Sequence, residues 1–237
     1  MIKVLSRLLP VALGALLAAC PSAVRKAPEP ASSLPTIASP DLSAAALYRV
    51  SSAASEAHVL VFRGGTLARL GHNHVMTSRA VTGQVWLHPQ IEKSGFELTF
   101  PVQELIVDDP EARRAAGSDF PPEIPQADRD GTRKNMLRAE VLDGERFPTI
   151  TLRSARVAGP LPSAKATVRI TIKDVSRDVE VPVNVASDAN RLSASGEFDI
   201  LQTDFGIKPF SIGLGALEVQ DRLRVKFKIV ADAQSKL

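Results

Sequence analysis

The 237-residue sequence contains little of what marks a disulfide-rich or catalytic protein. It has one cysteine, Cys20, which leaves no partner for a disulfide within the chain. It also lacks the Gly-x-Ser-x-Gly motif of hydrolases, a glycine-rich phosphate loop and the His-Glu-x-x-His motif of zinc proteases. These absences argue against the common hydrolase and nucleotide-dependent classes and predict that the protein is not an enzyme.

The chain has no large excess of charge of one sign. Its formal net charge is +3, and removal of a leader containing Lys3 and Arg7 lowers it by two, to +1. Lysine and arginine are scattered among aspartate and glutamate instead of forming a basic stripe, so nucleic acid is not expected as a partner. With 44% hydrophobic and 23% charged residues, the composition is that of an ordinary globular protein.

A long hydrophobic run is also missing, because the apolar stretch at residues 8–18 contains a proline and a glycine and is too short for a membrane-spanning helix. Basic residues precede this stretch and small residues follow it, which indicates a secretory signal. Residues 17–20, Leu-Ala-Ala-Cys, resemble the lipobox of bacterial lipoproteins. We therefore expect a lipoprotein signal peptide at residues 1–19 and an acylated Cys20 as the mature N-terminus. A plain signal peptide with a chance cysteine is the alternative.

Acyl chains on Cys20 would hold the protein on a membrane without a spanning helix. Pro21 stands where aspartate would indicate retention at the inner membrane, and it favours the outer membrane. Residues 20–45 are rich in proline, alanine and serine and lack hydrophobic periodicity, which is typical of a spacer. The sequence thus predicts an exported, periplasmic, lipid-anchored protein.

Alternating apolar and polar side chains, the pattern of half-buried strands, run through residues 46–233. In residues 166–185, two such runs flank the short polar segment 174–177 and predict an antiparallel hairpin. Similar runs on both sides bring the expected number of strands to about eight, and a sheet so apolar on one face usually closes into a sandwich or barrel. Residues 108–134 predict a long loop, and residues 132–141 predict one short helix.

Four stretches, in this order, resemble the YceI-like family of exported lipocalin-like proteins. They are Tyr48-Arg49-Val50, then Met136-Leu137-Arg138 with the turn and strand at residues 145–152, then the hairpin at residues 168–183, and last Thr203-Asp204-Phe205-Gly206-Ile207. The resemblance covers residues 47–233. We therefore expect a YceI-like domain at residues 46–233 and a tail at residues 234–237.

The resemblance implies an all-β fold, an antiparallel lipocalin-like barrel of about eight strands with one short helix and a long loop. It also implies an apolar tunnel that binds polyisoprenoid chains such as quinone tails or prenyl phosphates. Two features depart from the family pattern: the loop at residues 108–134 is long, and Met136 stands where relatives often have histidine. The segment Leu70-Gly71-His72-Asn73-His74-Val75 looks like the feature of a subgroup.

The apolar strand faces supply the candidate ligand-binding residues. An eight-stranded barrel either fills its interior with side chains or holds one small ligand. The residues alone favour a packed core, whereas the resemblance to a family of hollow barrels favours a ligand. The candidate lining residues are Phe62, Val85, Phe96, Leu98, Phe100, Ile150, Leu152, Val168, Ile170, Val181, Val183, Phe198, Val225 and Phe227.

His72, His74 and Arg138 are candidates for the barrel mouth or for contact with a ligand head group. The two histidines, two residues apart in an extended strand, would share one face at a spacing that suits a metal chelate. A transition-metal site normally has three or more protein ligands, and the other two histidines have no spacing relation to this pair, so metal is the weaker interpretation. Asp108 and Asp109 are expected to be solvated turn residues.

Together these expectations describe a membrane-tethered periplasmic protein that binds a polyisoprenoid or similar apolar lipid inside its barrel. Its partners would be the lipid and, through acylated Cys20, the membrane, and a homodimer is compatible with the sequence. No cofactor is expected beyond a bound isoprenoid or quinone. Two alternatives stay open. One is an envelope protein that binds a metal or redox cofactor through His72 and His74, and the other is a packed barrel that serves as an interaction module.

Cys20→Ser should leave the protein soluble or uncleaved, because the lipobox thiol is the group that receives the acyl chains. Cell fractionation, with membranes washed first in salt and then in detergent, measures the effect. The wild-type protein should need detergent for its release. Release of the wild type by salt alone would show that the acyl anchor does not exist.

Overall fold

The computed structural model describes residues 34–234, which contain twelve β-strands and two α-helices. The predicted signal peptide, Cys20 and the first part of the spacer lie outside the described residues. Within residues 34–234, no helix has the length and apolar character needed to cross a bilayer.

The elements have the following bounds. The strands are β1 (Ala46–Val50), β2 (Glu56–Gly64), β3 (His74–Ser78), β4 (Thr82–Leu87), β5 (Gly95–Pro101), β6 (Ile106–Val107), β7 (Thr149–Ala158), β8 (Ser163–Ile172), β9 (Val175–Ser187), β10 (Arg191–Leu201), β11 (Ser211–Ile212) and β12 (Leu217–Ala233). The helices are α1 (Pro110–Ala116) and α2 (Gln126–Met136).

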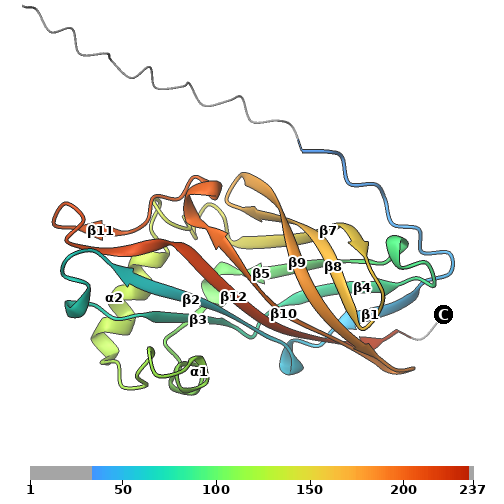
Figure 1. The fold of residues 1–237 in the computed structure, drawn as a ribbon, viewed down its shortest axis with the longest axis horizontal. Helices are drawn as coiled ribbons and strands as arrows, with labels where there is room; N and C mark the ends of the chain where they lie inside the picture. The colour runs from blue at the N-terminus through green and yellow to red at the C-terminus, as the bar shows by residue number, and fades with distance from the viewer. Residues whose placement is uncertain (1–33, 235–237) are drawn as a thin grey trace, which may run out of the picture. The chain divides into compact units, whose positions relative to one another are not determined.

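Eight of these strands form a closed ring, and Figure 1 shows the barrel from its side. Their order is β1-β4-β5-β7-β8-β9-β10-β12, and β1 closes the ring by pairing with β12, where Tyr48 lies opposite Ala233. Every strand pair in the described part of the chain is antiparallel. The predicted all-β, lipocalin-like barrel of about eight strands is therefore confirmed.

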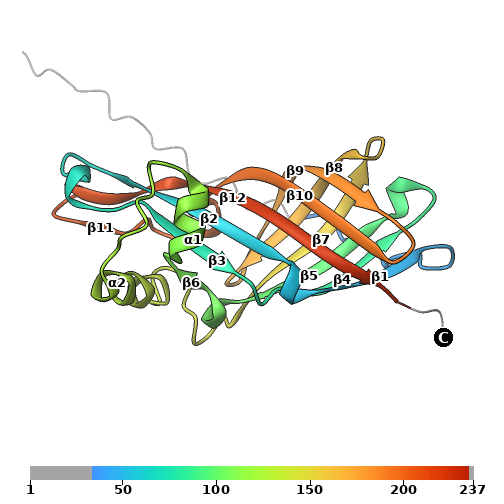
Figure 2. The same cartoon turned by 90° about the horizontal axis from the view of Figure 1, so that it is seen from below.

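Strands β2, β3 and β6 extend the barrel wall beyond this ring. One edge of β12 pairs with β10, and the other edge pairs with β1 near its end and with β2 over residues 218–228. β2 pairs with β3 and β3 with β6, just as β1 pairs with β4 and β4 with β5. Three barrel strands are thus each split into two pieces, and Figure 2 shows α1 and α2 beside the β2–β3–β6 part.

The alternation of apolar and polar residues in the sequence explains why one face of each barrel strand is buried. In β8 the even-numbered side chains from residue 164 to residue 172 are buried, and most of the residues between them are partly or fully exposed. The predicted turn at residues 174–177 is wrong, because β8 and β9 connect through Lys173 and Asp174 alone. The positive φ of Lys173, 58°, permits this two-residue connection.

The prediction of a single helix at residues 132–141 is also wrong. The segment expected to be a long loop contains both helices, and α1 begins with Asp109 as its N-cap, whose carboxylate accepts hydrogen bonds from the backbone N–H groups of Glu111 and Ala112. An aspartate followed by proline at the first helical position is a recognised helix start, and the sequence analysis missed it. α2 ends at Met136, so it shares only residues 132–136 with the predicted helix.

Gly83, in β4, should not accept a side chain. Its φ is +145°, and a Cβ atom there would overlap the backbone carbonyl oxygen of Glu97 on β5. We expect Gly83→Ala to lower the free energy of unfolding by about 1–3 kcal/mol. Gly131→Ala is the matched control, because the new Cβ would meet no atom there. Gly131 lies in α2, where alanine has the higher helix propensity, so the free energy of unfolding should rise by up to about 1 kcal/mol. Urea unfolding measures both; a Gly83→Ala protein as stable as the wild type would contradict the β4–β5 register.

Candidate functional site

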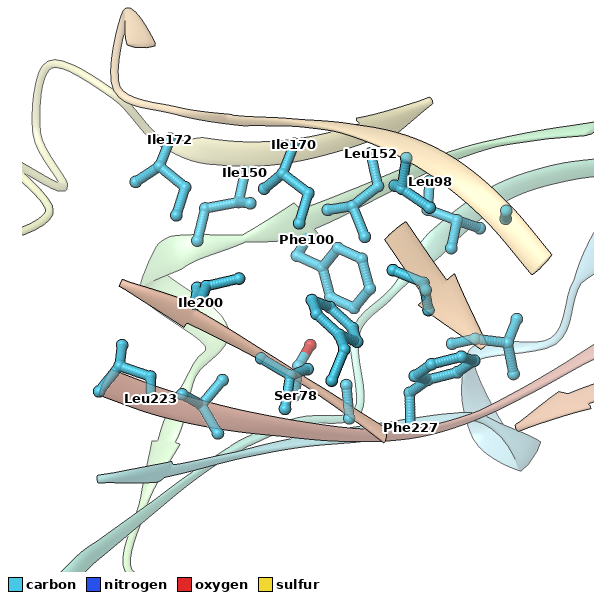
Figure 3. A pocket seen from close by; sticks show the side chains of 18 of the residues that line it. Ser78, Leu98, Phe100, Ile150, Leu152, Ile170, Ile172, Ile200, Leu223 and Phe227 are labelled. Carbon is cyan, nitrogen blue, oxygen red and sulfur yellow. The ribbon is translucent and has the colours of Figure 1, made fainter. Parts of the chain in front are cut away.

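The barrel encloses a cavity of about 380 Å³. Its wall is built by inward-facing side chains of β2 to β5, β7 to β10 and β12, together with residues of α2. In Figure 3, Ile150, Leu152 and Ile170 face Leu223 and Phe227 across the cavity. Among the described residues that line it, there is no lysine, arginine, aspartate or glutamate. The interior is therefore an uncharged and largely hydrocarbon surface.

Thirteen of the fourteen predicted lining residues lie on this wall. They come from strands whose alternation in the sequence is regular, so their inward direction follows from the two-residue period. They are Val85, Phe96, Leu98, Phe100, Ile150, Leu152, Val168, Ile170, Val181, Val183, Phe198, Val225 and Phe227.

Phe62, the fourteenth, does not line the cavity. It lies on the opposite face of β2 and packs edge-to-face against Phe120, with 5.6 Å between the ring centres. On β2 the odd-numbered residues 57, 59 and 61 line the cavity. The prediction was wrong because both faces of β2 are apolar, and the outer face is covered by Ala112 of α1 and by Phe120.

Several lining residues on the split strands and on the second helix were not predicted from the sequence. Met76 and Ser78 of β3, Leu105 and the α2 residue Met136 all reach the cavity. Met76, Leu105 and Met136 pack in one apolar cluster, so α2 covers the end of the cavity next to β3. The sequence of β3 does not show which face is inside, because Val75 and Thr77 on the other face are also fully buried.

Ser78 is one of the few polar residues in the apolar wall. Its side chain is almost fully buried, with 2% of the residue exposed, and its hydroxyl has no hydrogen-bond partner in the described part of the protein. Figure 3 shows the hydroxyl oxygen directed into the cavity. A buried hydroxyl without a hydrogen-bond partner lowers the stability of the folded protein, so an apolar residue would be expected at this position of an apolar wall.

His74, at the start of β3, is the only histidine among the residues that line the cavity. Its Nδ1 lies 2.7 Å from Oδ2 of Asp108, while Oδ1 of Asp108 accepts a hydrogen bond from the backbone N–H of Val75 at 2.9 Å. Asp108 is fully buried and has a positive φ of 55°. The expectation that Asp108 is a solvated turn residue is therefore wrong.

Arg113, from α1, completes this buried charge cluster. Its Nη1 donates to Oδ1 of Asp108 at 2.5 Å, and the arginine is as fully buried as the aspartate. Burial by itself would raise the pKa of the Asp108 carboxyl, but hydrogen bonds from His74, the backbone N–H of Val75 and Arg113 outweigh it and hold this pKa below its ordinary value. Asp108 is thus ionised at neutral pH and only accepts hydrogen bonds.

His72 and Arg138 do not line the cavity. His72 precedes β3, so the alternation of side chains along a strand does not place it on the same face as His74. Its side chain is exposed, and the centre of its ring lies 6.3 Å from that of His74. Arg138 is exposed and lies 3.5 Å from Glu140. Within the described residues, no three histidine, cysteine, aspartate or glutamate side chains come together as a metal site. A metal bound by His72 and His74 would therefore have no third ligand of these residue types among the described residues.

The comparison with known families decides the identity of the domain. A family model of the YceI-like domain matches residues 48–231. The chain belongs to the YceI-like family. No match was found among curated proteins.

Two solved structures are similar to this chain, and one of them supports the fold. The chain is similar to the crystal structure of Burkholderia cenocepacia BcnA, with a TM-score of 0.55 and 18% identity, over 77% of this chain and 99% of that chain. The Campylobacter jejuni YceI protein gives a TM-score of 0.48 and 12% identity over 67% and 84% of the two chains. At 18% identity, the likeness to BcnA concerns the fold alone.

Arg113→Met should be strongly destabilising, because it removes the cation that faces the buried Asp108 carboxylate. Breaking a buried pair in this way costs about 3–5 kcal/mol of unfolding free energy. Arg138→Met is the control, since it removes an exposed arginine whose ion pair is worth about 0–1 kcal/mol. Urea unfolding at neutral pH measures both variants. Equal unfolding midpoints would show that the Asp108–Arg113 pair does not hold α1 against the barrel.

Proposed function

We propose that this YceI-like protein is a membrane-tethered periplasmic binding protein for a polyisoprenoid or similar apolar lipid. The observation that carries the proposal is the uncharged wall of the cavity, where aliphatic and phenylalanine side chains from nine strands meet. Its volume of about 380 Å³ lies in the range of small-molecule binding sites. The tether rests on the predicted acylation of Cys20.

Burial of hydrocarbon is enough to drive binding in such a cavity. Each Å² of apolar surface removed from water contributes roughly 25 cal/mol, and a chain lying along the barrel contacts wall residues on all sides. The closed backbone ladder holds the wall in place, so little ordering of the protein is needed when the chain enters. A polyisoprenoid tail matches these requirements because it is long, narrow and almost purely apolar.

Two alternatives receive less support. A packed barrel would leave no room inside, whereas the large inward side chains Phe100, Phe198 and Phe227 still leave a cavity between them. A metal-binding role would have to rely on His74 and one exposed neighbour, His72. A metal-binding role also gives no reason for the rest of the wall to be apolar.

Val183→Trp tests the proposal because Val183 points into the cavity from β9. The indole should occupy the space of the lipid, and the amount of lipid that co-purifies should fall about fivefold or more, as measured by mass spectrometry. Asn184→Trp is the matched control, since Asn184 is the next residue of the same strand and is exposed. It should retain the lipid.

The same pair of variants separates a carrier from a packed module. In a packed core the tryptophan would act as an overpacked side chain and cost about 1–3 kcal/mol of stability. Thermal unfolding of Val183→Trp is therefore measured alongside its lipid content. Unchanged lipid content together with a large fall in melting temperature would overturn the proposed function.

A further inference from the structure

The orientation of the His74 imidazole follows from its contact with Asp108. The Asp108 carboxylate is ionised and accepts hydrogen bonds from Val75 N–H and Arg113, so it has no proton to offer to His74. The 2.7 Å contact therefore requires that Nδ1 of His74 is protonated and donates a hydrogen bond to Oδ2 of Asp108. Asp108 is a positioning residue, because it fixes both the tautomer and the orientation of the imidazole.

The charge of Asp108 is already balanced by Arg113, so a second cation on His74 would have no counter-charge beside the uncharged cavity wall. In the neutral ring, whose single proton is on Nδ1, Nε2 has a lone pair and no proton. It accepts a hydrogen bond and does not donate one. No hydrogen bond to Nε2 occurs within the described part of the protein. His74 thus offers an acceptor at the end of the cavity that α2 covers.

We propose that His74 binds the head group of the lipid and selects an uncharged head group that donates a hydrogen bond, such as an alcohol or a primary amide. This inference rests on the proposed function and adds the chemistry of the ligand's polar end. The α2 residues Thr132 and Asn135 also line the cavity and supply hydroxyl and amide groups for the oxygen of such a head group.

An anionic head group fits this wall poorly. The described lining residues include no lysine or arginine, and the charge of Arg113 is already balanced by Asp108. A phosphate drawn into the cavity would lose its hydration without gaining a cation. A carbonyl or ether oxygen can accept a hydrogen bond from Thr132 or Asn135 but has no proton to donate, so it would leave the lone pair of Nε2 unpaired.

Ser78 provides an internal comparison along the same strand face. It lies four residues from His74, a rise of about 13 Å along a strand, and its hydroxyl has no partner. If the head group binds at His74, the apolar chain passes Ser78 and leaves that hydroxyl unpaired. Ser78→Ala should then strengthen binding of every ligand by about the same factor, on the order of fivefold.

The test uses three ligands with one common chain: geranylgeraniol, its methyl ether and geranylgeranyl monophosphate. Trp86 is the only tryptophan and lines the cavity, so its fluorescence reports binding to the purified, lipid-free protein. Wild type should bind the alcohol about tenfold more tightly than the ether, which is a difference of ~1.4 kcal/mol in binding free energy. It should bind the phosphate most weakly.

His74→Phe should reduce the alcohol-to-ether ratio to about twofold or less while leaving ether binding nearly unchanged, because the ring stays and the acceptor is lost. His74→Gln should keep most of the preference, since its amide donates to Asp108 and its carbonyl accepts from the ligand. His72→Phe, which changes an exposed ring outside the cavity, should behave as wild type. Ser78→Ala should leave the ratio unchanged.

Other outcomes overturn the inference. Equal binding of alcohol and ether by wild type, or tightest binding of the phosphate, contradicts the selection by His74. A preference that disappears in Ser78→Ala and persists in His74→Phe places the head group at Ser78 instead. A stoichiometric metal that copurifies with wild type and is lost in His74→Phe assigns the imidazole to metal. If none of the three ligands binds, the proposed lipid-binding function fails and the inference with it.

Discussion

The structure depends on the closure of the sheet through β12. This 17-residue strand pairs with β10 along one edge and with β1 and β2 along the other, so both of its edges are hydrogen-bonded over most of their length and the sheet closes on itself. Because the backbone ladder holds opposite walls apart, the inward side chains cannot collapse onto one another as they would between two free sheets. The cavity therefore follows from the closure, and the apolar character of the cavity follows from the alternation of the strands.

A hollow apolar barrel provides affinity but little discrimination. Hydrocarbon burial depends on area and not on direction, so the wall formed by residues such as Leu98, Ile170 and Phe227 would accept many chains of suitable width. Discrimination between such ligands requires polar groups at defined positions. The described wall has few of them, and His74 and Ser78 are the two on β3.

The sequence predicted what a regular two-residue period controls. The closed barrel and the inward direction of Val168, Val181 and Val225 follow from alternation that is clear by eye. Phe62 was misplaced because β2 is apolar on both faces, and only the tertiary position of Phe120 shows which face is outside. Asp108 was misread for a different reason: a buried ion pair with Arg113 depends on contacts between α1 and β3, which no local pattern records.

Apart from the turn between β8 and β9, the wrong predictions concern the part of the chain where the barrel strands are split, and the buried Asp108–His74 contact lies there too. β6 is only two residues long, and the positive φ of Asp108 immediately after it turns the chain away from the sheet toward α1. That turn leaves the Asp108 carboxylate next to β3, where it accepts a hydrogen bond from the backbone N–H of Val75. In a continuous strand, a backbone carbonyl would accept this hydrogen bond. A carboxylate in this position can also hold His74, whereas a continuous β5–β6 strand would offer only a backbone carbonyl. The interruption of the ladder is thus what allows a polar, oriented side chain to face an otherwise hydrocarbon cavity.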